Sequence, residues 1–115
     1  REEIFNFIET ENISGVLLIS GDRHGARGFK IPRPSGFELY EFEVATLGGV
    51  GGPNAMAPNP INQIFGYHGL GLRAFGEFTF NTEANEPRVT FRLIDEYENI
   101  MEEHILSYTS LTPKK

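Results

Sequence analysis

The 115-residue sequence predicts an α+β fold. An amphipathic segment opens the chain, a continuous apolar run follows it, and three later segments alternate apolar with polar side chains, as half-buried strands do. The length suits one domain with one core, and a hydrophobic share of 39% is typical of a packed interior. We therefore expect residues 1 to 115 to form a single unit, with an N-terminal helix and a buried strand followed by mostly antiparallel strands.

The first two elements follow from their apolar spacing. Residues 1 to 11 predict a helix, because Ile4, Phe7 and Ile8 recur at helical intervals opposite an acidic outer face. The run from Val16 to Ile19 is continuous rather than alternating and lies between glycines, which is typical of a strand buried on both faces.

Two further strands are expected in the next thirty residues. A short one over residues 29 to 31 ends at Pro32, because proline has no backbone N–H to donate to a sheet. Residues 37 to 46 predict a half-buried strand with Tyr40 and Phe42 inward and with Glu41 and Glu43 outward.

The second half of the chain predicts a long loop followed by an antiparallel meander. Residues 48 to 71 are rich in Gly and Pro and show no sustained period, so we expect a loop there. Strands are expected at residues 72–80, 88–93 and 100–107, joined by turn-forming residues. Their aromatic side chains are expected to fill the core, namely Phe75, Phe78, Phe80 and Phe91.

Composition excludes several classes of function. A formal charge of −6 and a pI near 5.0 leave no basic face for nucleic acid, whose binding depends on clustered Lys and Arg. With no cysteine, the chain has no disulfide and no Cys-ligated zinc. Its apolar runs are too short to span a membrane, so we expect a soluble polypeptide. Because it begins at Arg1, inside a segment that already reads as a helix, we expect a processed or truncated piece of a longer protein.

The candidate site is Gly21-Asp22-Arg23-His24-Gly25, directly after the apolar strand. Open α/β sheets bind ligands at the carboxyl ends of their strands. On a tight glycine-flanked loop, the carboxylate of Asp22 and the imidazole of His24 can converge on one cation, with Fe, Zn, Mn or Ca compatible with these donors. On this short pattern alone, a turn with an exposed imidazole is favoured over a metal site.

A wider resemblance favours the metal site. The run ISGVLLISGDRHGA at residues 13 to 26, with the acidic helix before it and ELYEFEV at residues 38 to 44, resembles the C-terminal part of PhoD-like alkaline phosphatases. These belong to the calcineurin-like metallophosphoesterases. The resemblance continues more loosely through FGEFTF at residues 75 to 80 and PRVTFRLIDEYENI at residues 87 to 100, and only the loop at residues 48 to 71 is unmatched.

The resemblance implies a fold and an activity. The expected fold is half of an α/β/β/α sandwich, and the expected function is the C-terminal part of a metal-dependent phosphomonoesterase or phosphodiesterase, with a phosphate ester as substrate. It implies that His24 ligates a metal and that Asp22 ligates one or orients the ligands. Arg23 would clamp substrate phosphate, unless its side chain points away into solvent. Export or a periplasmic location is implied by the same resemblance.

The family's earlier motifs, D-x-H, G-D-x-x-D and G-N-H-D, do not occur in this chain. Two ligands cannot hold two metals, so we expect the chain to be inactive alone and to need an N-terminal half or a partner chain. The alternative is a non-catalytic β-rich binding or assembly module. Of the other histidines, His68 is expected in an exposed loop and His104 in a surface pair with Glu102. Acidic residues near Asp95 are expected in a turn.

Overall fold

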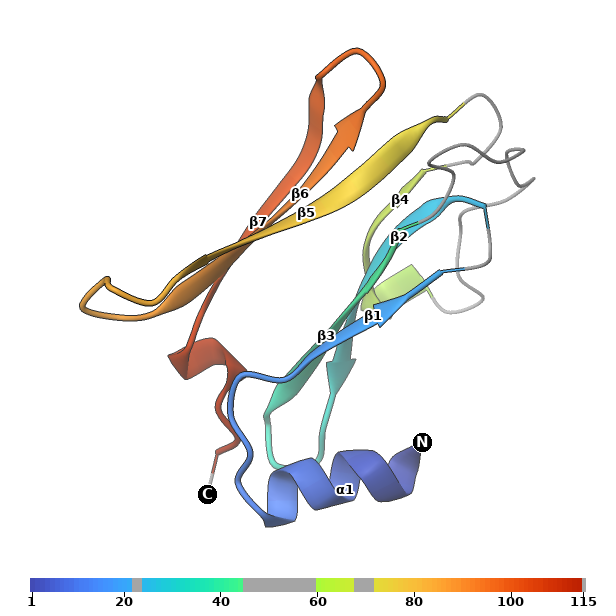
Figure 1. The fold of residues 1–115 in the computed structure, drawn as a ribbon. Helices are drawn as coiled ribbons and strands as arrows, with labels where there is room; N and C mark the ends of the chain where they lie inside the picture. The colour runs from blue at the N-terminus through green and yellow to red at the C-terminus, as the bar shows by residue number, and fades with distance from the viewer. Residues whose placement is uncertain (22–23, 45–59, 68–71, 115) are drawn as a thin grey trace.

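The computed structural model describes residues 1–21, 24–44, 60–67 and 72–114. It confirms the α+β fold, with one α-helix and seven strands among these residues (Figure 1). The elements are α1 (Glu2–Thr10), β1 (Leu17–Ser20), β2 (Ala26–Pro32), β3 (Glu38–Glu43), the 3₁₀ turn η1 (Pro60–Asn62), β4 (Gln63–Tyr67), β5 (Ala74–Asn81), β6 (Arg88–Asp95), β7 (Ile100–Ser107) and the 3₁₀ turn η2 (Thr109–Leu111).

The first four strands form a mixed sheet in the order β1-β3-β2-β4. β1 runs parallel to β3, whereas β2 is antiparallel to both β3 and β4. Strands β1 and β2 follow each other in the chain, yet β3 lies between them. β1 therefore ends, and β2 begins, at the carboxyl end of β3, and in the sequence the GDRHG motif lies between these two strands.

The last three strands form the expected antiparallel meander, β5-β6-β7, which packs across one face of the mixed sheet (Figure 1). The contact between the sheets is aromatic. The rings of Phe42 and Phe91 stack at 4.3 Å between centroids, and Phe65 of β4 stacks on Phe91 at 5.8 Å. Phe42 and Phe91 are 0% and 1% exposed, so this contact is the centre of the main core.

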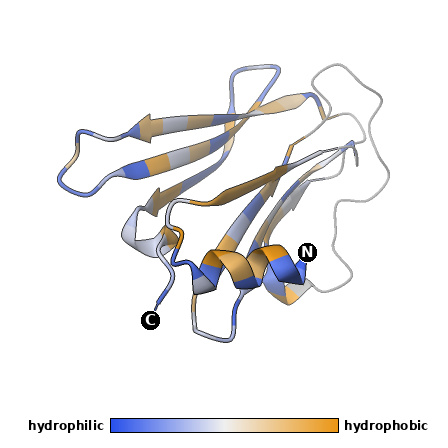
Figure 2. Cartoon of the chain, turned by 60° about the horizontal axis from the view of Figure 1, so that its bottom comes forward, coloured by the Kyte–Doolittle hydropathy of each residue, from blue (hydrophilic) through white to orange (hydrophobic). Residues whose placement is uncertain are grey.

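Helix α1 packs against the other face of the mixed sheet, near the β2–β3 turn (Figure 1). Its buried residues are Phe5 and Ile8, which contact Phe37 and Leu39. The predicted stripe is therefore wrong in part: of its three members only Ile8 is buried, while Ile4 and Phe7 are 61% and 58% exposed. Apolar residues are spread widely around this helix (Figure 2), and spacing alone did not select the buried pair.

A charged residue fixes the helix to the sheet. Arg33, just after β2, is 8% exposed and donates to Glu9 at 2.8 Å, to Glu2 at 2.9 Å and to Asn6 at 2.7 Å. Its guanidinium also lies 5.3 Å from the centre of the Phe5 ring. A buried guanidinium needs such partners, and here all of them come from α1.

The predicted burial is wrong for two strands: β1 is less buried than its pattern predicts, and β3 is more buried. β1 is not buried on both faces: it lies at the edge of the mixed sheet, and Ile19 is 65% exposed. β3 is not half-buried, because it lies between β1 and β2 with Leu39 in contact with α1 and Phe42 in the main core. Glu43, expected in solvent, is 4% exposed and paired with Arg27.

The expected loop at residues 48 to 71 is wrong in its later part. Residues 60 to 67 form η1 and β4, and β4 completes the mixed sheet by pairing with β2. Phe65 of β4 contacts the main core because Gly28, its partner on β2, has no side chain in the way: a Cβ there would overlap the Phe65 ring. The remainder of the expected loop lies outside the described residues.

The aromatic residues of β5 and β6 divide between core and surface. Phe91 and Phe78 pack in the core as expected, whereas Phe75 and Phe80 are 41% and 67% exposed. Within the part of the chain that the structure describes, no helix has both the length and the apolar character needed to cross a membrane.

Candidate functional site

The described residues of the GDRHG motif, Gly21, His24 and Gly25, lie at one end of the mixed sheet, at the carboxyl ends of the parallel strands β1 and β3. The backbone N–H of Val44, just after β3, donates to the carbonyl oxygen of Ser20 at 3.1 Å. A Cβ on Gly21 would lie 3.5 Å from the Val44 carbonyl oxygen. The start of the motif therefore rests directly on the end of β3.

Of the predicted site residues, the structure describes His24, while Asp22 and Arg23 lie outside the described residues. His24 is exposed and has a left-handed backbone, with φ of 55°. This conformation is strained for a side chain with a Cβ, and such residues concentrate in turns and at functional sites. Asn12 and Glu98 share it in ordinary turns, so the φ of His24 indicates a tight turn and does not by itself indicate a ligand site.

A row of polar side chains lies at the same end of the mixed sheet, on the face that α1 covers at its other end. The Ser20 hydroxyl donates to Glu41 Oε1 at 2.8 Å. Arg27 Nη2 donates to Glu43 Oε2 at 2.5 Å, and both side chains are at least nine-tenths buried. Among the described residues, Arg27 Nε and Glu43 Oε1 have no hydrogen-bond partner. Sequence reasoning missed this pair, because it placed Glu43 on the solvent side of a half-buried strand.

Metal ligands do not gather elsewhere in the described residues. No group of three His, Cys, Asp or Glu side chains among them is placed to hold a metal ion. His24 is one exposed donor, and one zinc ion normally takes three or four protein ligands. The donors that the structure describes around the motif thus do not make up a metal centre on their own.

A second polar cluster joins β4 to β7. Glu102 accepts from the Tyr67 hydroxyl at 2.7 Å through one oxygen and lies 3.0 Å from His104 Nε2 through the other. The His104 ring stacks on Phe65 at 5.4 Å between centroids. Burial, followed by the hydrogen bond and the negative charge of Glu102, raises the pKa of Tyr67 to about 12.

This cluster corrects the expected surface pair of His104 and Glu102. Both side chains are only about one-quarter exposed, and they lie on the face of β7 that also carries buried Leu106. The two-residue spacing of Glu102, His104 and Leu106 is the signal that places them together on that inner face. Because Tyr67 lies in the segment expected to be a loop, sequence reasoning missed it.

The acidic residues near Asp95 form a turn, as expected. Asp95 accepts from the backbone N–H groups of Tyr97 and Asn99 at 2.9 and 2.8 Å and from the Asn99 side chain at 3.0 Å. The Asn99 side chain is the main cause that lowers the pKa of Asp95, and the two backbone donors add to it. The Asp95 carboxylate therefore closes the β6–β7 hairpin. The other histidine, His68, lies outside the described residues.

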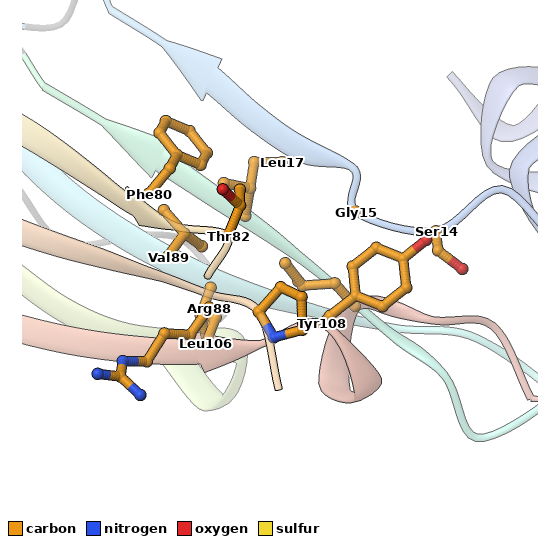
Figure 3. A pocket seen from close by; sticks show the side chains of 11 residues that line it. Ser14, Gly15, Leu17, Phe80, Thr82, Arg88, Val89, Leu106 and Tyr108 are labelled. Atoms are coloured by element: carbon orange, nitrogen blue, oxygen red, sulfur yellow. The ribbon is translucent and has the colours of Figure 1, made fainter. Parts of the chain in front are cut away.

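An apolar pocket of about 320 Å³ opens between the two sheets beside β1 (Figure 3). Leu17 borders it on the mixed sheet, and Phe80, Val89 and Leu106 border it on the antiparallel sheet. The Tyr108 ring lies at its margin next to Gly15 (Figure 3). The pocket forms because the antiparallel sheet does not fully cover the edge strand, which no sequence pattern indicated.

Comparisons of this chain with models of protein families, with curated proteins and with solved structures found no match.

Proposed function

We propose that this chain is the C-terminal part of a PhoD-like metal-dependent phosphoric ester hydrolase, to which it contributes late metal ligands. The proposal depends on one observation. The motif that resembles that family, Gly21 to Gly25, follows the carboxyl end of a strand that runs parallel to its neighbour. Ligands of open α/β sheets bind at that end, and the exposed position of His24 leaves its imidazole accessible to a cation.

The role of this chain in that enzyme is to supply ligands. His24 would bind a cation through a ring nitrogen, and Asp22 would bind one or orient the ligand shell. Phosphoester hydrolysis at a two-metal centre also needs cations that activate water and hold the attacking and leaving oxygens. The remaining ligands would come from an N-terminal half or a partner chain, which makes this chain inactive by itself.

The test uses the full-length product of the gene that encodes this chain. Metal content is measured together with hydrolysis of p-nitrophenyl phosphate and bis(p-nitrophenyl) phosphate. We expect His24→Ala to lower metal content and activity by roughly 10- to 100-fold or more. Loss of a side chain that only supports a metal ligand already has an effect of that size, and His24 would bind the metal directly. Glu98→Ala is the matched control, because Glu98 is also an exposed residue with a left-handed backbone in a turn.

Activity that His24→Ala and Asp22→Ala leave unaltered would contradict the proposal. That result would favour the second candidate, a non-catalytic β-rich binding or assembly module in which GDRHG is only a tight turn. The exposed edge of β1 is the observation that favours this candidate, since Ile19 is an apolar side chain 65% exposed on an edge strand.

A further inference from the structure

The ion pair of Arg27 and Glu43 is buried but only partly satisfied. Arg27 Nη2 lies 2.5 Å from Glu43 Oε2, and the two side chains are 10% and 5% exposed. The attraction within a buried ion pair repays the loss of water only when its remaining donors and acceptors are also hydrogen-bonded. Among the described residues, however, Arg27 Nε and Glu43 Oε1 lack a partner. One donor and one acceptor are therefore left over in the same buried pair.

The strand register places Glu43 beside both ends of the segment that carries the GDRHG motif. Glu43, the last residue of β3, is paired with Ser20 at the end of β1 and with Arg27 near the start of β2. Residues directly opposite each other in neighbouring strands share one face of the sheet, so these three side chains lie together. In the sequence, Gly21 follows Ser20 directly, and Arg27 comes two residues after Gly25. The ion pair therefore connects the strand ends on both sides of the motif.

The neighbouring side chains on this face do not account for the two free atoms. Helix α1 packs at the other end of the face, in a cluster with Leu39. The Phe29 ring centre lies 5.1 Å from the guanidinium carbon of Arg27, but this ring brings no nitrogen or oxygen. The Ser20 hydroxyl is already bonded to Glu41 at 2.8 Å. These described neighbours therefore leave one donor and one acceptor for a group on the motif side.

The two free atoms match the needs of two kinds of metal ligand. A ligating histidine usually donates its second ring N–H to a carboxylate or another acceptor, and a ligating carboxylate is itself hydrogen-bonded by a donor. Glu43 Oε1 is a free acceptor, and Arg27 Nε–H is a free donor. The candidate imidazole ligand, His24, is three residues before Arg27 in the sequence. The pair thus offers the outer partners that an imidazole and a carboxylate ligand both require.

We propose that Arg27 and Glu43 are positioning residues for the metal ligands of the GDRHG motif. In the metal-bound enzyme, Glu43 Oε1 accepts from one ring N–H of His24, which fixes the ring and leaves its other nitrogen for the cation. The exposed His24 ring would turn toward the sheet to make this bond. Arg27 holds Glu43 through Nη2 and donates from Nε to a carboxylate ligand. This inference rests on the proposed function, because it takes His24 as a ligand.

The test measures the affinity of the full-length gene product for Mn²⁺ and for Zn²⁺ by competition with a chelating dye. Arg27→Met and Glu43→Met are combined in one variant, because replacing a buried ion pair by apolar residues of similar volume is often neutral for stability. We expect an unfolding midpoint in urea near that of the wild type and a metal affinity lower by roughly 10- to 100-fold. Wild-type metal affinity in the folded double variant would overturn the proposal.

A second variant and a control separate positioning from stability. Glu43→Gln keeps the shape of the side chain and an oxygen for Arg27, but it places an amide donor where Oε1 accepts. It should therefore also lower metal affinity, by roughly 10-fold or more. Arg92→Met combined with Glu103→Met is the matched control, because this ion pair of 2.7 Å lies exposed on the antiparallel sheet. A loss of metal affinity in the control equal to that in the buried pair would contradict the assignment.

Hydrolysis of the two nitrophenyl esters is measured on the same samples. A wild-type protein that has neither bound metal nor hydrolytic activity would sink the proposed function and the positioning role with it. Metal-dependent hydrolysis by the wild type, with unaltered metal affinity in both variants of the buried pair, would sink the positioning role alone.

Discussion

Replacing Arg33 with alanine is expected to destabilise the protein substantially, because this side chain joins α1 to the mixed sheet. The side chain is 5% exposed, and the Glu9 side chain that it binds at 2.8 Å is 16% exposed. Hydrogen bonds to charged partners contribute about 1.5 to 3 kcal/mol when they are buried. The Glu2 partner is 72% exposed, and exposed pairs contribute little. With the bond to Asn6, we expect Arg33→Ala to cost about 3 kcal/mol of unfolding free energy.

Urea unfolding followed by circular dichroism measures this loss, and a melting temperature lower by roughly 10 °C should accompany it. Arg92→Ala is the control. Arg92 also bonds two carboxylates, Glu77 and Glu103, but it lies on the exposed face of the antiparallel sheet, where salt and solvent screen the charges. A loss for Arg33→Ala no greater than that for Arg92→Ala would refute the reasoning from burial.

The same contact makes a prediction about pH. The Ser35 hydroxyl, followed by the Arg33 guanidinium, holds the pKa of Glu9 below its ordinary value of 4.5. A lowered pKa stabilises the fold above the unfolded-state pKa, and the stabilisation is lost as the pH falls through the folded-state pKa. The difference in unfolding free energy between the wild type and Arg33→Met should therefore narrow as the pH falls below about 5. A constant difference across that range would contradict the role of Glu9.

Three further predictions concern the core. In a spectrophotometric titration of the four tyrosines, one tyrosine should ionise near pH 12, and this transition should be absent in Tyr67→Phe. Because the pKa of Tyr67 is higher in the folded than in the unfolded state, the unfolding free energy of the wild type should fall as the pH rises from 10 to 12. Gly28→Ala should destabilise by about 2 kcal/mol, since its Cβ would overlap Phe65, and unaltered stability would refute that packing. Glu43→Gln should cost about 3 kcal/mol in thermal unfolding, whereas replacing Arg27 and Glu43 together by methionine should cost less than Glu43→Gln alone.

The sequence predicted where most helices and strands lie in the chain, but it did not predict which strands lie next to each other in the sheets. The strand expected over residues 88–93 is confirmed, and Val89, Phe91 and Leu93 at its alternate positions lie in the core, because side chains on one face of a strand share one environment. Burial was predicted wrongly for the run at Val16 to Ile19 and for the segment around Glu43. Apolar spacing indicates which environment suits a strand, but it does not show which strands lie on either side of it. The order β1-β3-β2-β4 is set by contacts between distant segments, which spacing within one segment cannot record.

The sequence predicted only those parts of the candidate site that lie within one segment of the chain. The position of GDRHG at the carboxyl end of a strand follows from the chain itself. The Tyr67–Glu102–His104 cluster could not be predicted in this way, because it forms only when β4 lies close to β7. The Gly-rich sequence around β4 predicted a loop and not a strand. The buried pair of Arg27 and Glu43 depends in the same way on β3 lying beside β2.

The position of β3 between β1 and β2 has a consequence for folding. β1 precedes both β2 and β3 in the chain, yet it can take its place in the sheet only after β3 is formed, because β3 is the strand with which it pairs. Pairing of β1 with β2 alone would be a trap that must open again, and non-local pairing of this kind slows folding. We therefore expect β1 to join the mixed sheet after β2 and β3 have paired.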